Sequence, residues 1–156
     1  GLLEALLIVG NKGWLYEGFY RAVAAYPHRA RVLLPGYVAD EDLPALYTGA
    51  AVTVQPSLYE GFGLPVLEAM ACGSPVCASR STSLPEVGGD AARYFDPKST
   101  EEMSDVIRRV LEDGALAEAM RRAGLERAAG FTWRRTAEET AAVYDRVLGE
   151  EIRDEG

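Results

Sequence analysis

The chain has 156 residues, 48% of them apolar, and its 24 acidic and 16 basic side chains give a formal net charge of −8 at pH 7. This length and apolar content suffice for one domain with a substantial core and exclude a disordered chain. The negative charge argues against a nucleic-acid partner, since the arginines at 121, 122 and 127 are interleaved with acids at helical spacing and predict a solvated helix face.

The sequence contains two cysteines, Cys72 and Cys77. Two are too few for a disulfide framework, and neither has the companions that a zinc site requires. We expect both thiols to pack in the core or at a helix end, in a protein kept in a reducing compartment. No signal peptide is expected from residues 2–9, which are short, carry Glu4 and lack a basic lead-in. No run approaches the roughly 20 apolar residues of a membrane span.

Short apolar runs alternate with helical patterns as far as residue 95. The runs, many of them ended by Gly or Pro, predict buried parallel strands at residues 5–9, 31–34, 51–54, 75–78 and 92–95. Helical patterns fall between them at residues 14–26, 40–47 and 66–72, with one short turn at 84–87. Asp40 is the expected N-cap of the second helix. This alternation predicts an α/β fold, a doubly wound Rossmann-like parallel sheet with helices on both faces.

The remaining third of the chain has a purely helical pattern. Ser99 or Thr100 is expected to cap a helix with apolar residues at i, i+3, i+4, i+7 and i+8 from Met103. A second helix is expected over residues 115–129 and a third from Thr132, which together form a helical C-terminal segment. No repeat or interior boundary is visible, so residues 1–156 are expected to form a single domain.

The most informative segment runs from Glu60 to Glu68 and reads Glu-Gly-Phe-Gly-Leu-Pro-Val-Leu-Glu. Its two glycines allow a tight turn, and Pro65 suits the first turn of the helix that follows. A turn that opens into a helix presents free N–H groups and the positive end of the helix dipole, where an anion such as a diphosphate can bind. Glu60 precedes this turn and Glu68 lies about one helical turn inside, a layout that fits a nucleotide sugar, with its anionic middle and hydroxyl-rich ends.

Residues 56–76 resemble, almost position by position, the E-x7-E signature of retaining, nucleotide-sugar-dependent glycosyltransferases of family 4, the group 1 transferases of GT-B fold. Residues 36–43, 83–92 and 131–133 are also similar to that family, in the right order and over nearly the whole chain. The resemblance implies that Glu68 binds the ribose hydroxyls and that Glu60 lies beside the donor sugar as the catalytic carboxylate. The competing interpretations are a solvated helix residue at 68 and an ordinary loop acid at 60.

The resemblance also implies the rest of a donor site. The backbone of Phe62, Gly63 and Leu64 would meet the sugar and phosphates, and the loop at Tyr37 and Val38 would lie against the base. Tyr37 could equally be a packing residue. No tightly bound cofactor and no obligatory metal are expected, because the sequence has no Asp-x-Asp pair and no histidine cluster.

Full members of the family have two Rossmann-like domains, and this chain resembles most of the C-terminal one, without its first strand and without the N-terminal partner domain. The family's Arg and Lys for the donor diphosphate belong to the missing part, and neither Lys12 nor Arg80 matches them. We therefore expect the isolated chain to be inactive and to bind nucleotide weakly. We also expect the open sheet position to favour self-association.

The expected function is the donor-binding half of an enzyme that moves a sugar from a UDP- or GDP-sugar to a hydroxyl of a glycan, lipid or small molecule. The signature as a whole is most similar to mannosyl and related transferases of cell-surface polysaccharide or glycolipid synthesis. The expected location is the cytoplasm, with the intact enzyme free or peripheral to the inner face of the membrane. The alternatives are another GT-B enzyme, such as a nucleotide-sugar epimerase, and a non-enzymatic α/β interaction module.

Overall fold

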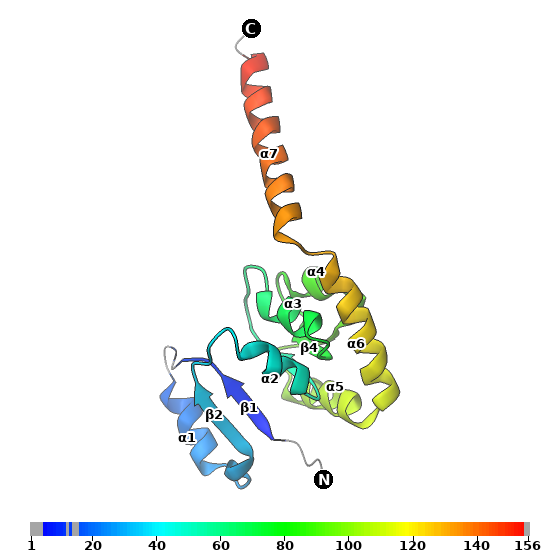
Figure 1. Ribbon diagram of the computed structural model, residues 1–156. Helices are drawn as coiled ribbons and strands as arrows, with labels where there is room; N and C mark the ends of the chain where they lie inside the picture. Colours follow the sequence, from blue (N-terminus) through cyan, green and yellow to red (C-terminus); the bar gives the residue numbers. More distant parts are fainter. Residues whose placement is uncertain (1–4, 12, 14–15, 155–156) are drawn as a thin grey trace.

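The computed structural model describes residues 5–11, 13 and 16–154, and its five strands are all parallel (Figure 1). The strands are β1 (Leu6–Val9), β2 (Val32–Gly36), β3 (Thr53–Gln55), β4 (Val76–Ser79) and β5 (Arg93–Phe95). Each lies within two residues of its predicted position. Parallel strands joined by helices form the predicted α/β architecture, so the fold class is confirmed.

Helices connect the strands and complete the chain after β5. They are α1 (Glu17–Ala25), α2 (Leu43–Gly49), α3 (Leu64–Ala71), α4 (Leu84–Gly88), α5 (Thr100–Glu112), α6 (Gly114–Ala129) and α7 (Trp133–Asp154). Two single 3₁₀ turns, Arg29–Arg31 and Gly89–Ala91, precede β2 and β5. The predicted start of the first helix, Trp14, lies outside the described part of the chain.

The strands divide between two hydrogen-bonded sheets, β1–β2 and β3–β4–β5. In Figure 1, β1 lies on the side of its pair toward the rest of the molecule. Within the described chain, β1 pairs only with β2, and β3 only with β4.

The core lies on both faces of β4, whose four residues are all buried. Val76 and Ala78 pack on one face in a cluster with α3 and α4, while Cys77 packs on the other with Phe95, Val110 and Met120. Because successive residues of a strand point to opposite faces, this arrangement requires helices on both sides of the sheet. Cys72 and Cys77 are free thiols, the latter fully buried.

Two details of the helix starts differ from expectation. Asp40 is not the N-cap of α2; the N–H of Asp42 donates to the Ala39 carbonyl at 2.9 Å, so residues 39–42 form a turn and the helix begins at Leu43, with Pro44 in its first turn. Ser99 caps α5, as one of the two expected residues. Asp113, which the sequence pattern did not reveal, caps α6 by accepting from the Leu116 N–H at 2.9 Å.

The arginines of α6 are more than a solvated face. Arg121 donates to the carbonyl of Gly73 at 2.6 Å, and Arg127 donates to the carbonyls of Glu86 and Val87. The prediction of a purely solvated face was therefore wrong for these two residues. Their long side chains reach unpaired carbonyls just beyond the end of α3 and within α4, and so tie α6 to both helices.

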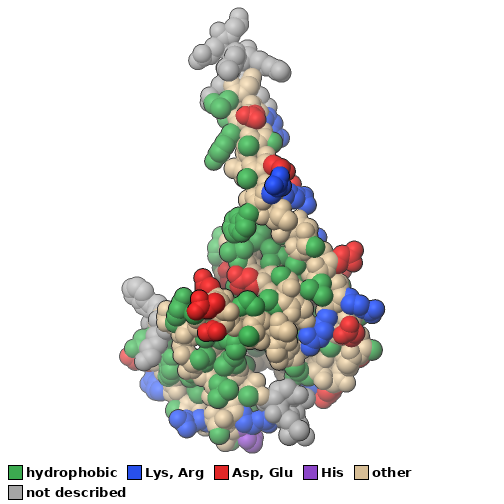
Figure 2. All heavy atoms as spheres, in the orientation of Figure 1, with side chains coloured by type: hydrophobic (Ala, Val, Ile, Leu, Met, Phe, Trp, Pro, Cys, Tyr) green, Lys and Arg blue, Asp and Glu red, His purple; other side chains and the backbone are tan. Residues whose placement is uncertain are grey.

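The last helix, α7, projects away from the rest of the molecule (Figure 1). Figure 2 shows apolar side chains along one side of it. Trp133, Tyr144, Val147 and Leu148 are all exposed. An apolar stripe therefore lies exposed along one side of this helix.

Candidate functional site

The site expected from the sequence forms where β3 and β4 end and α3 begins. Gly63 is the N-cap of α3, with φ +105°, and it is buried against Leu84. Pro65 lies in the first turn, as predicted. Within the described chain, the N–H groups of Phe62, Gly63 and Leu64 donate to no acceptor. Three unpaired donors at a helix start are suited to an anion.

The carboxylate of Glu60 is held by one of its two oxygens. Oε1 accepts from Gln55 Nε2 at 2.8 Å and from Ser57 Oγ at 2.8 Å, and Gln55 Nε2 also donates to Ser57 Oγ at 2.9 Å. No described residue donates to Oε2. The side chain is therefore fixed in orientation and keeps a free acceptor oxygen, as a group that meets a ligand hydroxyl requires.

The backbone of Glu60 is held by the loop that follows β4. Its N–H donates to Thr82 Oγ1 at 3.0 Å, and its carbonyl accepts from Ser83 Oγ at 3.1 Å. The parallel register places Gln55 beside Ala78, so the loops that leave the two strands start at the same edge of the sheet. Ligands of doubly wound sheets bind at this edge.

Glu68 lies in the middle of α3, and its side chain is exposed. Its Oε2 accepts a hydrogen bond of 3.1 Å from the hydroxyl of Tyr47 on α2. Burial, together with the neighbouring carboxylate and this hydrogen bond, raises the pKa of Tyr47 to about 12. Tyr47 thus stays protonated and donates to Glu68 at neutral pH, which orients the carboxylate instead of leaving it free in solvent.

Two aromatic rings lie beside the start of α3. Phe62 is 46% exposed and meets Phe131 edge to face, with ring centroids 6.2 Å apart. The guanidinium of Arg127 lies 5.1 Å from the centroid of the Phe131 ring. Leu64 is 48% exposed. The loop therefore presents apolar side chains as well as free N–H groups, and its far end is supported by the segment between α6 and α7.

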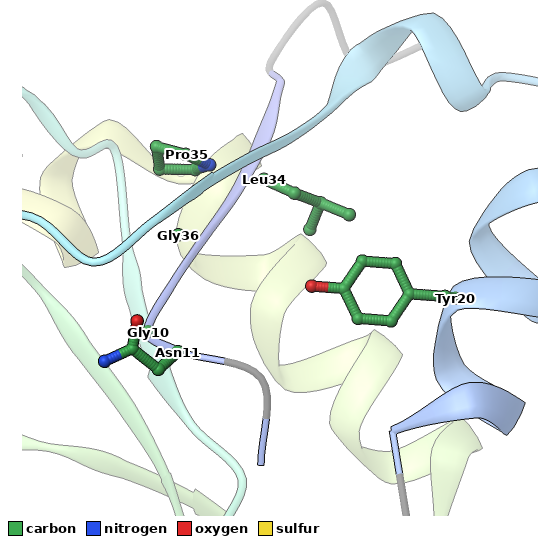
Figure 3. Close-up of a pocket in the computed structure, with 6 residues that line it drawn as sticks. All are labelled: Gly10, Asn11, Tyr20, Leu34, Pro35 and Gly36. Carbon is green, nitrogen blue, oxygen red and sulfur yellow. The ribbon is translucent and has the colours of Figure 1, made fainter.

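Tyr37 and Val38 lie elsewhere, directly after β2. Tyr37 is 65% exposed and Val38 is half-buried. A surface hollow of about 590 Å³ opens beside them, lined by residues at the ends of β1 and β2 and by Tyr20 of α1. Figure 3 shows Tyr20 reaching from α1 toward Leu34, with Gly10, Asn11 and Gly36 on the opposite side. Within the described chain, no hydrogen bond joins Tyr37 or Val38 to α3 or to the Glu60 loop.

Basic groups are scarce at this edge. Arg80 forms an ion pair of 3.0 Å with Glu102 and donates to the Tyr94 carbonyl, so its charge is already engaged. Lys12 lies outside the described residues. Among the residues that the structure covers, no group of three His, Cys, Asp or Glu side chains could hold a metal ion. The prediction that no metal is obligatory is not tested by this.

Sequence reasoning missed the residues that hold the two acids. Gln55 and Ser57 lie just before Glu60, but nothing in their spacing indicates that both point at its carboxylate. Tyr47 and Thr82 are 21 and 22 residues from the acids that they contact. Only the pairing of β3 with β4 and the packing of α2 on α3 bring them together.

The comparisons with known proteins decide the family. The family model described as glycosyl transferases group 1 matches residues 5–127. The chain belongs to this family. Its catalogued relatives include O-antigen chain mannosyltransferase B of Escherichia coli, which is 42% identical over 139 residues. This alignment covers 89% of the chain but 36% of the relative, so the group 1 chain spans about a third of that protein's length.

Solved structures agree with the family. Sucrose-phosphate synthase from Thermosynechococcus elongatus matches with a TM-score of 0.82 and 31% identity, over 93% of this chain and 39% of that protein. The C-terminal domain of a group 1 glycosyl transferase from Francisella tularensis matches with a TM-score of 0.70 and 25% identity, over 81% of this chain and 68% of that one. The chain thus has the fold of a GT-B glycosyltransferase domain. Across the described residues, no helix of it combines the length and the apolar character needed to cross a bilayer.

Proposed function

We propose that the chain is the donor-binding domain of a retaining glycosyltransferase. In this proposal the intact enzyme moves a sugar, specifically mannose, from a nucleotide diphosphate donor to an acceptor hydroxyl. The observation that carries the proposal is the start of α3, where three unpaired N–H groups lie between two oriented carboxylates. Likeness to a mannosyltransferase of O-antigen synthesis and to a C-terminal group 1 domain supports it. The same likeness supports a place in cell-surface polysaccharide synthesis.

In this proposal each part of the donor meets a different group. The diphosphate lies at the free N–H groups of Phe62, Gly63 and Leu64, which stabilise the charge that develops on the leaving group. The ribose diol donates to the Glu68 carboxylate, held from behind by Tyr47. The sugar meets the free Oε2 of Glu60, and the base lies against the loop at Tyr37 and Val38.

The α3 start supplies only part of a diphosphate site. The helix dipole contributes about 0.3–2 kcal/mol to anion binding, and Arg80 is engaged with Glu102. We propose that a partner domain and a further basic segment complete the site in the longer enzyme. The isolated chain is then a weak nucleotide binder without transferase activity, and we place the intact enzyme in the cytoplasm.

Calorimetry on the 156-residue chain with GDP, UDP, GDP-mannose and UDP-glucose tests the proposal. We expect saturable binding of at least one nucleotide, weakened ten- to hundredfold by Glu68→Ala, since charge-assisted hydrogen bonds contribute about 1.5–3 kcal/mol. Glu138→Ala on α7, which removes an exposed acid far along the chain, should leave the affinity unchanged. The absence of any heat of binding with all four nucleotides at millimolar concentration would contradict nucleotide binding and favour the non-enzymatic interaction module.

A further inference from the structure

A cluster of serine hydroxyls joins the loops that follow β3 and β4. Ser79 Oγ lies 2.5 Å and Ser81 Oγ 2.9 Å from the carbonyl of Ser57, and the two hydroxyls are 2.8 Å apart. Ser79 is fully buried. Because Ser57 Oγ in turn donates to the Glu60 carboxylate, the loop after β4 supports the side chain of Glu60 through Ser57.

The same loop holds the main chain of Glu60 directly. Thr82 Oγ1 accepts from the Glu60 N–H, and Ser83 Oγ donates to the Glu60 carbonyl. Both polar groups of the Glu60 main chain are therefore satisfied by side chains 22 and 23 residues away. The main chain of Glu60 is held in a loop, where no ladder or helix would otherwise fix it.

Thr82 combines this contact with an unfavourable backbone conformation. Its φ is +47°, and it is the only residue other than glycine with positive φ in the described chain. A β-branched residue is disfavoured in this region, whereas glycine adopts it without steric cost. A threonine here therefore destabilises the loop, and what it adds over glycine is the hydroxyl that accepts from Glu60.

We propose that Thr82 is a positioning residue that acts through Glu60. It fixes the Glu60 main chain so that Oε2 faces the donor sugar, and the strain at Thr82 is retained because the hydroxyl is needed. The inference rests on the proposed function, in which Glu60 meets the sugar and not the nucleotide. It assigns a role in the donor site to a residue that itself touches no substrate.

The first test needs no ligand. Amide hydrogen exchange of the Glu60 N–H, measured by NMR, should accelerate about fivefold or more in Thr82→Gly and Thr82→Ala, because one hydrogen bond of ordinary strength is lost. Thr82→Ser should retain protection, and Thr140→Ala on α7 serves as the control for removing a hydroxyl. Unchanged exchange in Thr82→Gly would overturn the inference.

The second test separates positioning from general support of the fold. GDP-mannose and UDP-glucose are titrated against GDP and UDP in the wild-type chain, Thr82→Gly, Glu60→Ala and the double variant. Thr82→Gly should weaken the binding of the two sugar nucleotides about fivefold more than that of GDP and UDP. In the Glu60→Ala background, Thr82→Gly should have no further effect on the affinity for any of the four ligands. The inference would be overturned if Thr82→Gly weakened the binding of all four ligands equally, or if it changed the affinity for the sugar nucleotides by the same factor with and without Glu60. Either result would leave the proposed function intact.

A wild-type chain that binds none of the four nucleotides would count against the proposed function instead. The exchange rate of the Glu60 amide would then still decide whether Thr82 fixes that part of the main chain.

Discussion

The two acids of the E-x7-E segment are each held by one oxygen. Glu60 is held by Gln55 and Ser57, and Glu68 is held by Tyr47, so the two carboxylates are oriented before any ligand arrives. Orientation in advance matters because an unheld side chain would lose rotamer entropy on binding, at about 0.5–1.5 kcal/mol per side chain. A tyrosine suits this purpose, because its hydroxyl stays protonated far above neutral pH.

The raised tyrosine pKa values predict a loss of stability at alkaline pH. Burial raises the pKa of Tyr47 and of Tyr94 to about 12, each from 10.0. The folded state therefore keeps tyrosine protons that the unfolded state has released, so the contribution of these two rings to the free energy of unfolding is constant below about pH 10 and falls as the pH rises toward 12. The buried thiol of Cys77, whose pKa burial raises from 9.0 to about 12, adds a loss that begins near pH 9 and is common to the wild type and the tyrosine variants. Urea unfolding at pH 9 and pH 11.5 measures the effect.

Variants assign this loss to the two rings. Tyr47→Phe and Tyr94→Phe should each reduce the difference between the two pH values, whereas Tyr144→Phe, at an exposed position on α7, should leave it unchanged. An undiminished difference in the double Tyr47→Phe, Tyr94→Phe variant would contradict this assignment.

At the level of elements, α3 depends on the conformation of Gly63. This N-cap has φ +105°, and a Cβ placed on it would lie 2.6 Å from Leu84 Cδ2, in a side chain that is fully buried. Glycine is thus required for two reasons, the backbone conformation and the close approach of α4. Gly61, two residues earlier, has neither constraint, since a Cβ there would meet nothing within 4 Å and its φ is not in the left-handed region.

These two glycines form a matched pair for mutation. Gly63→Ala should lower the free energy of unfolding by roughly 2–4 kcal/mol, from backbone strain and overpacking together. Gly61→Ala should change it by no more than about 0.5 kcal/mol. Thermal and urea unfolding give both values, and equal destabilisation by the two substitutions would show that the α3 start is not held as described.

The elements themselves follow from local patterns, but the way the site is held does not. Apolar runs such as residues 5–9 place every strand, and the Gly-Pro spacing around Pro65 places α3. The N-cap of α2 differs from the expected Asp40, because the helix begins only at Leu43, after Asp42 and with Pro44 in its first turn. The contact of Thr82 with Glu60 could not be predicted, because it depends on the register of β3 against β4.

At the scale of the whole molecule, the division into two sheets is the main departure from a continuous doubly wound sheet. In the described chain, β1 has one unpaired edge, and its residues Leu6, Leu7 and Val9 are exposed. The fold therefore carries an apolar strand edge that no other described strand covers. Such edges pair with other chains unless they are covered.

We therefore predict concentration-dependent self-association of the isolated chain. Light scattering between about 10 μM and 1 mM should show a rising average mass, and Leu7→Lys, which places a charge on β1, should reduce the rise. Leu148→Lys on α7 is the control variant, since Leu148 is also exposed but α7 lies far from β1. A smaller rise in Leu7→Lys alone would place the contact between chains at the edge of β1. A mass that stays monomeric, or that responds only to the α7 substitution, would count against association through the sheet edge.

The binding of a nucleotide sugar at the start of α3 underlies both the proposed function and the role of Thr82. Mapping of ¹H–¹⁵N shifts during titration with GDP-mannose and UDP-glucose tests it most directly. We expect the amides of Phe62, Gly63, Leu64 and Glu68 to shift or broaden together while those along α7 stay unchanged. Shifts confined to other parts of the molecule, with the α3 start unaffected at saturating ligand, would show that the donor does not bind there.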